Sequence, residues 1–442
     1  MTETRSRNPF AVRDFRLLWV GEAVSTLGDQ FALIALPWLA LVMTGSALAL
    51  GSVLALMAVP RALLMLIGGV SVDRLSPRRV MLASNAVRLV AVTILGTVVL
   101  AGRGELWMLY AFALVFGVAD AFFFPAQTSI VPELIEGDLL QRANGIVQGT
   151  AQATVLLGPA VAGLVIAALG SNGGAASTEG VAAALLVDAA TFLVSLVTLG
   201  LIKPRQRADR PASSVLDDIR EGFRHVRNSP GLSAMILVSL AGNFLIVGPF
   251  EVGLPVIAYS RLPEGAAAFG ILTSAFGGGS LIGLALAAML PKPRPERFAM
   301  VVVGAVSLSG LGLVLLPFIT STLTGAAVIG LAGIALGYGN LHGMTWTQTR
   351  VAPALMGRVM SVMIMGSVGL VPVSMLIAGA VVQVSLDGML IVAGIGMAVL
   401  CAGSLLSPAV RHMGMEPAFE EASGDPADGS TVSGSDVAQV PA

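Results

Sequence analysis

Long apolar runs alternate with short polar segments along this chain, and the pattern produces twelve such runs. Each run is about 20 residues or longer and carries few charges, which is the length that an α-helix needs to cross a lipid bilayer. The pattern therefore predicts an all-α integral membrane protein with spans at residues 17–43, 46–70, 80–101, 106–131, 145–169, 180–202, 231–258, 265–290, 298–319, 322–348, 360–384 and 387–408.

The polar segments divide the chain into five regions. Residues 203–230 separate six predicted spans from the other six, and residues 409–442 are rich in Ser, Gly, Asp and Pro, which is typical of disorder. We predict an N-terminal segment at 1–16, a six-helix bundle at 17–202, a linker at 203–230, a second six-helix bundle at 231–408 and a disordered tail at 409–442.

Residues 213–228 of the linker have apolar side chains at helical spacing, acidic residues in the first turn and arginines near the end. This pattern favours an amphipathic helix on the membrane surface, whose terminal charges suit the helix dipole. A flexible linker is the alternative.

The two bundles repeat weakly in sequence. Pro37 and Pro255 are 218 positions apart, and so are Pro77 and Pro295. An internal repeat around a central break is typical of transporters, whose binding site lies between the two repeats near the middle of the membrane.

The distribution of positive charge predicts the orientation. Of the 25 Lys and Arg residues, 21 fall on the side of the N-terminus, 2 on the opposite side and 2 within the spans. Because cytoplasmic segments of membrane proteins are enriched in Lys and Arg, we expect both termini and the linker to be cytoplasmic.

Composition excludes several classes of protein. Hydrophobic residues make up 55% of the chain and charged residues 12%, about half the charged share of soluble domains. The net charge of −1 gives no reason to expect a nucleic-acid partner, and the single cysteine, Cys401, allows neither an intrachain disulfide nor a cysteine metal site. We expect no metal and no cofactor. No phosphate-binding loop of the G-x-x-x-x-G-K-[ST] type occurs, so ATP is not expected to be the direct energy source.

A charged segment at residues 69–79 joins the second and third predicted spans. It contains Gly69, Asp73, Arg74, Arg78 and Arg79. We expect Gly69 to allow close backbone approach and Asp73 to bind the free amides of a neighbouring helix N-terminus, so that the segment acts as a gating loop. The simpler interpretation is a basic cytoplasmic turn.

This G-x-x-x-D-R-x-x-x-R-R segment resembles the signature loop of the major facilitator superfamily, with Ser76 at the family's usual second glycine and Pro77 at a usual arginine. Further stretches resemble one bacterial branch of that superfamily, the macrolide and siderophore (enterobactin-type) exporters. They are Phe15–Trp19, Leu27–Asp29, Pro60–Arg61, Phe124–Ala126, Pro132–Leu134, Ala143–Asn144, Gly248–Pro249, Leu254–Pro255 and Gly357–Ser361.

The resemblance implies the major facilitator fold and a secondary active transporter in the inner membrane of a bacterium, with several spans and a monomeric state. Its partners would be a small-molecule substrate, protons and the lipid bilayer. We expect a proton-coupled exporter of amphipathic drugs or secreted metabolites such as siderophores, working by alternating access. A lipid flippase, a metabolite importer and a non-transporting scaffold are the alternatives. A membrane enzyme is disfavoured, because no nucleophile and base cluster at one membrane face.

The fifth span contains Gly158, Pro159 and Gly163, which resemble the glycine–proline motif of antiporters. The glycines remove side chains where helices cross, and the proline frees a carbonyl and permits a bend. Ordinary close packing is the alternative. In the fourth span, Asp120 stands in a helix where many family members carry an arginine.

Ionisable residues inside the spans usually have a function or a partner, because burying them is costly. Glu22 and Asp29 lie seven residues apart and hence on one helix face. We consider Asp29, Glu22 and Asp120 as proton-coupling residues, and Arg61 and Arg88 as partners of Asp120 in intramembrane ion pairs. Glu22 in water at the cytoplasmic interface and Asp29 as a structural hydrogen-bond acceptor are the alternatives.

Polar residues of other spans are candidates for the substrate cavity. Asp188 is expected nearer the outer than the inner end of its span, either wet or paired. Glu251 is considered for substrate selectivity, with a wet outer vestibule as the alternative. The remaining cavity candidates are Asn243, Gln148, Gln152, Asn340, His342 and Trp346, of which His342 fits a hydrogen-bonded helix residue better than a proton carrier.

Overall fold

A computed structural model of the chain describes residues 8–135, 137, 139–170, 178–203, 220, 223–224, 226–227 and 229–415. Its described part contains twelve helical segments long and apolar enough to cross a membrane. The all-helical class and the twelve spans predicted from the hydrophobic pattern are therefore confirmed.

The first six spans form the N-half. After the short helix η1 (Pro9–Ala11) come α1 (Arg13–Thr44), α2 (Ala47–Leu75), α3 (Pro77–Leu100), α4 (Leu106–Leu134), α5 (Leu139–Leu169) and α6 (Glu179–Leu201).

The other six spans form the C-half. The first span of this half, which is the seventh of the chain, has three pieces: α8 (Pro230–Gly242), the π-helical segment η3 (Asn243–Val247) and α9 (Gly248–Arg261). The others are α10 (Ala266–Met289), α11 with η4 (Pro295–Leu315 and Leu316–Phe318), α12 (Thr322–Arg350), α13 (Pro353–Val382) and α14 (Leu386–Ser404), followed by α15 (Pro408–Arg411) and η5 (Met413–Met415).

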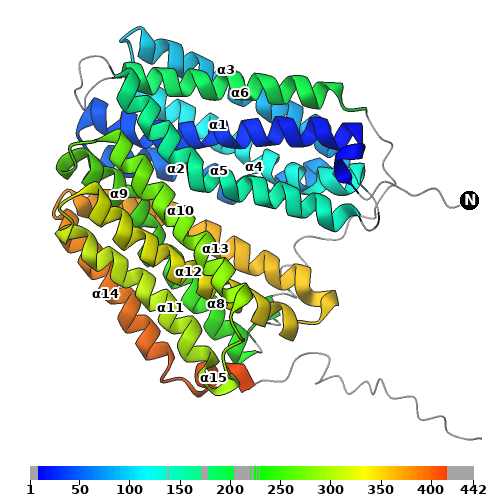
Figure 1. The fold of residues 1–442 in the computed structure, drawn as a ribbon, viewed down its shortest axis with the longest axis vertical. Helices are drawn as coiled ribbons and strands as arrows, with labels where there is room; N and C mark the ends of the chain where they lie inside the picture. Colours follow the sequence, from blue (N-terminus) through cyan, green and yellow to red (C-terminus); the bar gives the residue numbers. More distant parts are fainter. Residues whose placement is uncertain are drawn as a thin grey trace, which may run out of the picture.

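The two halves meet at one end of the molecule and separate towards the other. Figure 1 shows them converging near α9 and diverging towards the end where the N-terminus emerges. At the converging end α2 packs on α13 and α5 packs on α10. At the diverging end a cluster of buried apolar residues, including Phe15, Met81 and Phe123, consists of N-half residues alone.

Glycine makes the close contact between the halves possible. A Cβ atom on Gly51 would lie 2.6 Å from the carbonyl oxygen of Met375, and one on Gly163 would lie 3.1 Å from the Cα atom of Gly270. Small residues let helix backbones approach within a membrane, where no hydrophobic force drives helices together. The Nε2 atom of Gln383 also donates a hydrogen bond to Oγ of Ser46 at 3.2 Å.

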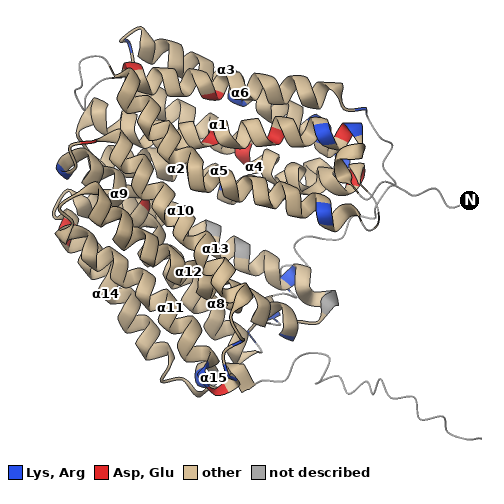
Figure 2. Ribbon diagram, viewed as in Figure 1, with Lys and Arg blue, Asp and Glu red and all other residues tan. Residues whose placement is uncertain are grey.

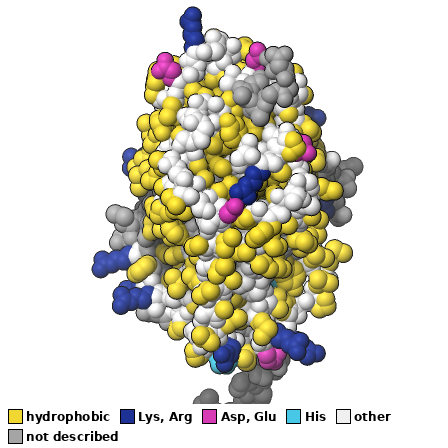
Figure 3. Space-filling view, turned by 90° about the vertical axis from the view of Figure 1, so that its left-hand side faces the viewer, with side chains coloured by type: hydrophobic (Ala, Val, Ile, Leu, Met, Phe, Trp, Pro, Cys, Tyr) yellow, Lys and Arg dark blue, Asp and Glu magenta, His cyan; other side chains and the backbone are white. Residues whose placement is uncertain are grey.

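Charged residues are unevenly placed along this long molecule. Figure 2 shows most Lys and Arg residues near the diverging end, and a few acidic and basic residues in the middle of the N-half. Figure 3 looks onto the converging end, which hydrophobic side chains largely cover and where charged side chains are scattered.

The segment 69–79 is almost entirely helical, which differs from the predicted loop. Helix α2 continues to Leu75 and α3 begins at Pro77, so only Ser76 separates them. Ser76 has φ of 86° and ψ of 140°, a conformation that favours glycine. A Cβ on Gly69 would meet nothing within 4 Å, whereas one on Gly68 would lie 3.1 Å from the Cα of Phe122 in α4. Gly68, not Gly69, therefore makes the close approach.

Described structure extends past residue 408, where the sequence pattern predicted a tail. Helices α15 and η5 occupy residues up to Met415, and the indole Nε1 of Trp346 donates a hydrogen bond to the carbonyl of Met413 at 2.7 Å. This bond fastens the end of the described chain to α12. Most of the predicted amphipathic helix at 213–228 and the tail beyond 415 lie outside the described residues.

Candidate functional site

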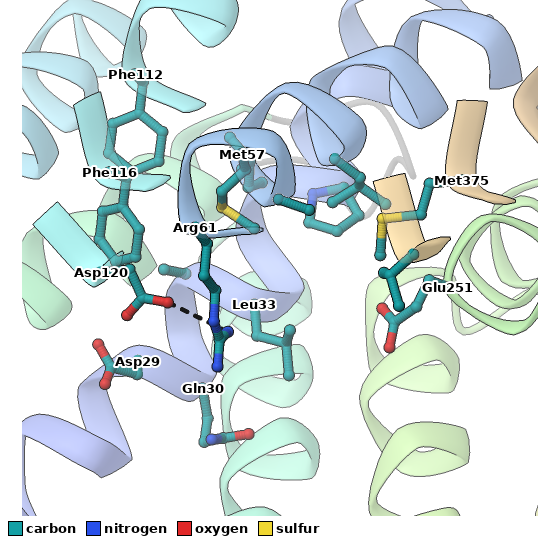
Figure 4. Close-up of a pocket in the computed structure, with 16 residues that line it drawn as sticks. Asp29, Gln30, Leu33, Met57, Arg61, Phe112, Phe116, Asp120, Glu251 and Met375 are labelled. Carbon is teal, nitrogen blue, oxygen red and sulfur yellow. Dashed lines mark ion pairs between the residues drawn. The ribbon is translucent and has the colours of Figure 1, made fainter. Parts of the chain in front are cut away.

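A cavity of about 470 Å³ lies between the two halves. Helices α1, α2 and α4 of the N-half form one wall, and α9 and α13 of the C-half form the other (Figure 4). Its lining is mostly apolar and consists of Asp29, Gln30, Ala32, Leu33, Leu36, Pro37, Leu54, Met57, Ala58, Arg61, Phe112, Phe116, Asp120, Glu251, Val371 and Met375.

Asp120 joins two arginines on the N-half wall. Its Oδ2 atom lies 3.2 Å from Nη1 of Arg61, and its Oδ1 atom accepts from Nη2 of Arg88. Arg61 also lies over the ring of Phe124, 5.5 Å from the centroid. Asp120 thus holds two positive charges from different helices, and its charge is engaged in the described structure.

Aromatic rings enclose Arg88. Its side chain is 1% exposed, and its guanidinium carbon lies 4.2 Å from the ring centroid of Phe123, 5.1 Å from that of Phe116 and 5.8 Å from that of Phe192. The negative faces of aromatic rings attract a cation, which partly replaces the water lost on burial. The rings therefore fix Arg88 where it pairs with Asp120.

Glu22 and Asp29 extend this charged group along α1. Glu22 is 6% exposed and accepts a hydrogen bond from Nε2 of Gln127 at 2.5 Å. It is buried against α4, so the alternative of a wet interfacial residue is wrong. Asp29 of α1 lines the cavity beside Asp120 of α4 (Figure 4). Its Oδ1 atom has no hydrogen-bond partner among the described residues.

Glu251 brings a carboxylate to the opposite wall. It lies in the first turn of α9, and Figure 4 shows it across the cavity from Arg61 and Asp120. It makes no hydrogen bond or ion pair with the part of the chain that is described here. Glu251 is thus the acidic group that the C-half offers to whatever occupies the cavity.

The other predicted cavity residues lie elsewhere. Asn243 and Asn340 line a separate cavity of about 450 Å³ inside the C-half. Trp346 is buried and bonded to Met413, and His342 packs against the rings of Phe298 and Tyr338.

Two glutamines of α5 complete this group. Gln148 is exposed and Gln152 is half-buried, and neither lines the central cavity. Helical position alone did not show which faces turn inward.

Several lining residues were not anticipated from the sequence. Phe112 and Phe116 precede Asp120 by eight and four residues, which places all three on one face of α4. Met57 likewise precedes Arg61 by four residues on α2. A spacing of four or eight residues from a charged residue of the same span could have identified these lining residues in the sequence.

The glycine–proline segment lies at the contact between the halves. A Cβ atom on Gly158 would lie 2.7 Å from Cβ of Gln30, so the glycine makes room for a lining residue of the cavity. The amide of Ala160 donates to Oγ of Ser274 on α10 at 2.9 Å. The segment therefore connects the cavity wall with the contact between α5 and α10.

Arginine 78 of the signature segment caps a helix. Arg78 donates from Nε to the carbonyl of Leu199 and from Nη2 to that of Gly200, each at 2.8 Å, at the end of α6. A cation at this position suits the negative end of the helix dipole. Arg74 and Arg79 are exposed, and the side chain of Asp73 lies outside the described part of the structure.

The chain is similar to known transporters. The sequence model of the Major Facilitator Superfamily matches residues 18–374. The multidrug efflux pump Tap of Mycobacterium tuberculosis (strain ATCC 25618 / H37Rv) is 27% identical over 414 residues, which cover 91% of this chain and 95% of Tap. Macrolide efflux protein A of Streptococcus pyogenes is 24% identical over 272 residues, which cover 61% of this chain and 64% of that protein.

Solved structures share the fold. The nucleoside transporter NupG superposes with a TM-score of 0.69 at 13% identity, covering 89% of this chain and 98% of NupG. A bacterial homologue of the iron transporter ferroportin superposes with a TM-score of 0.68 at 15% identity, covering 89% of this chain and 98% of the homologue. With a family match over most of its length and the matching twelve-helix fold, this chain belongs to the Major Facilitator Superfamily and is a membrane transporter.

Proposed function

We propose that the protein exports amphipathic small molecules in exchange for protons, by exposing its central cavity alternately to the two sides of the membrane. The observation that carries this proposal is the cavity between the halves, whose walls are apolar but carry a carboxylate on each side, Asp29 and Glu251. The proposed substrates are drugs or secreted metabolites such as siderophores.

The lining favours a substrate with an apolar body and a positively charged or hydrogen-bonding group. Phe112, Phe116 and the methionines Met57 and Met375 offer adaptable apolar contacts. Glu251 has no cation of its own in the described structure. A substrate cation placed between the walls would supply that charge. Two relatives, the multidrug efflux pump Tap and macrolide efflux protein A, are efflux proteins, which supports export as the direction.

The shape of the molecule supports alternating access. The halves are closed at the α2–α13 and α5–α10 contacts and separate at the other end. With the termini in the cytoplasm, as the Lys and Arg distribution favours, the separated end faces the cytoplasm, where an exporter loads its substrate.

Asp29 is the proposed coupling residue. It lines the cavity and no other charged residue of α1 except Glu22 lies within two turns of it. A proton on Asp29 makes the group cheap to bury, and loss of that proton leaves a charge that attracts a cation or an arginine across the cavity. Binding of the proton and of the substrate then alternate.

Purified protein in lipid vesicles tests this proposal. Vesicles with an acidic interior should accumulate ethidium, a permanently charged amphipathic cation, as protons leave. Asp29→Asn should abolish this uphill accumulation and retain exchange of ethidium at equal pH, and Glu22→Gln should give a milder loss. Asp387→Asn removes a surface carboxylate that pairs with Arg261 and is the matched control.

Protein-free vesicles set the baseline, and erythromycin serves as a second probe. Failure of the parent protein to move either probe in response to the pH gradient would contradict the proposal. Movement of a probe in the same direction as protons would identify an importer instead.

A further inference from the structure

Three N-half helices direct polar residues into one interior region beside the cavity. Helix α1 contributes Glu22, Ser25 and Asp29, α3 contributes Asn85 and Arg88, and α6 contributes Asp188, Thr191 and Ser195, all with helical spacings of three, four or seven residues. Helix α6 packs on both α1 and α3, and the Nδ2 atom of Asn85 donates to Oγ of Ser195 at 2.9 Å. We call these eight residues the polar seam.

The polar seam contains buried polar atoms without partners among the described residues. They occur on all three helices and are Glu22 Oε1, Ser25 Oγ, Asp29 Oδ1, Asn85 Oδ1, Arg88 Nε and Asp188 Oδ2. Buried polar atoms in proteins are nearly always paired, and an unpaired one is expensive. Protons and water are the partners that would satisfy such a group of carboxyl, amide and hydroxyl atoms.

Asp188 is a fully buried member of the seam. It is 0% exposed and lies nine residues from the start of α6, about 14 Å along the helix axis. Of the two alternatives expected for Asp188, wet or paired, the wet one is therefore wrong, although the residue does lie nearer the start of α6 than its end. Oγ1 of Thr191 donates a hydrogen bond to the Oδ1 atom of Asp188 at 3.4 Å.

Gly28 brings Asp188 against α1. A Cβ atom at position 28 would lie 2.7 Å from Oδ1 of Asp188 and 2.8 Å from Cβ of Thr191. Only glycine leaves this space. The carboxyl group of Asp188 therefore touches the backbone of the residue next to Asp29, on the side of α1 away from the opposite half.

Charge counting shows that the region is short of cations. The middle of the N-half holds four carboxyl groups, those of Glu22, Asp29, Asp120 and Asp188, and two guanidinium groups, those of Arg61 and Arg88. Both arginines already contact Asp120. Helix α5 also packs on α6, and its one charged residue, Arg142, lies in its first turns. Two uncompensated negative charges in a membrane interior would be very costly.

We propose that Asp188 is a second proton-carrying residue of the transport cycle, which exchanges a proton with Asp29 past Gly28. The step moves one proton from the carboxylic acid of one residue to the carboxylate of the other, and the solvent supplies and receives the proton. The inference rests on the proposed proton-coupled function. It adds a proton site inside the N-half that the substrate does not touch.

This arrangement separates the path of the proton from that of the substrate. Asp29 faces the cavity, whereas Asp188 is absent from its lining. A substrate that displaces the proton of Asp29 need not expel it to the cavity, because the carboxylate of Asp188 accepts it. Release then follows through the seam towards Glu22, which lies nearer the start of α1 than Asp29 does.

Infrared difference spectroscopy of the purified protein, without substrate, tests the pair directly. The carbonyl stretch of protonated carboxyl groups is recorded across a pH titration in choline chloride. The parent should show bands from at least two buried acids. Asp188→Asn should remove one band and shift the band that Asp29→Asn removes. Asp387→Asn should leave both bands unchanged.

The outcomes separate this inference from the proposed function. An unchanged spectrum in Asp188→Asn would overturn the proton pair, whatever the transport result. Loss of the bands when sodium replaces choline would also overturn it, because sodium would then be the neutralising ion. Bands as expected with no proton-driven ethidium movement would support the pair and contradict the exporter proposal.

A transport measurement then places Asp188 in the cycle. Proton release coupled to ethidium transport should be slower in Asp188→Asn than in the parent, with ethidium binding retained. Proton release at the parent's rate in a correctly folded Asp188→Asn protein, checked by size-exclusion chromatography, would overturn its role in the cycle.

Discussion

The N-half and the C-half share a plan of six spans but differ sharply in the charge they bury. The middle of the N-half contains Glu22, Asp29, Arg61, Arg88, Asp120 and Asp188, whereas the corresponding described part of the C-half contains Glu251. Topology has therefore been repeated while chemistry has diverged. On the proposed function, the N-half handles protons and the C-half supplies the wall that discriminates among substrates.

Removing Asp120 should have the largest effect on stability. Asp120→Asn takes the shared partner from Arg61 and Arg88, and loss of one partner of a buried ion pair costs about 3–5 kcal/mol. Glu251→Gln, the matched change in the C-half, removes no ion pair of the described structure and should leave stability nearly unchanged. Thermal unfolding in detergent measures both.

A compensating variant sharpens this test. Arg88→Met combined with Asp120→Leu removes both buried charges and should recover part of the lost stability, because apolar replacement of a buried pair is often tolerated. Equal unfolding temperatures for the parent and Asp120→Asn would show that the N-half charges do not stabilise one another. The two halves would then not differ in how much their buried charges contribute to stability.

Glu251→Gln should have an intermediate effect, confined to substrate choice. A hydrogen bond to a charged group contributes about 1.5–3 kcal/mol, and each 1.4 kcal/mol is roughly tenfold in affinity. The variant should raise the KM for ethidium about tenfold and leave the KM for neutral chloramphenicol unchanged, which competition in vesicles measures. Equal losses for both probes would contradict a role for this carboxylate in recognising positive charge.

Ser76→Gly should have the smallest effect. The α2–α3 turn consists of Ser76 alone, with φ of 86°, whereas residues 290–294 separate α10 from α11 in the C-half. Relief of backbone strain of about 1–3 kcal/mol exceeds the entropic penalty of glycine, about 0.5–1 kcal/mol. The variant should raise the unfolding free energy by roughly 1 kcal/mol.

A serine with ordinary geometry is the control. Ser407 precedes α15 with φ of −71° and its side chain makes no capping hydrogen bond, so Ser407→Gly should stabilise nothing. If Ser76→Gly lowered stability as Ser407→Gly does, the tight turn of the N-half would be unstrained.

The number and position of the spans could be predicted because burial in lipid requires long helices with few charges. Such helices appear in the sequence as long apolar runs. Depth could also be estimated: Asp188 lies nine residues into α6, nearer the start of this 23-residue helix than its end, as expected. Its contact with Gly28 could not be predicted, because it depends on how α6 is rotated against α1.

The lining of the cavity was predicted unevenly for the same reason. Asp29, Asp120 and Glu251 line it, and the buried charge of each was visible in an apolar run. Asn243, Asn340 and Trp346 were equally polar or aromatic, but the rotation of η3 and α12 turns them into the C-half or against Met413. Helix rotation is set by tertiary packing, which periodicity within a nearly uniform apolar span does not encode.

The glycine contacts between the halves have a consequence for the speed of switching. Where Gly51 meets Met375 and Gly163 meets Gly270, backbone lies against backbone. At these two points, separation of the halves requires no side chain to change its rotamer. Larger side chains at these glycines would raise the energy barrier between the closed and the open contact. They should therefore lower the turnover rate before they weaken substrate binding.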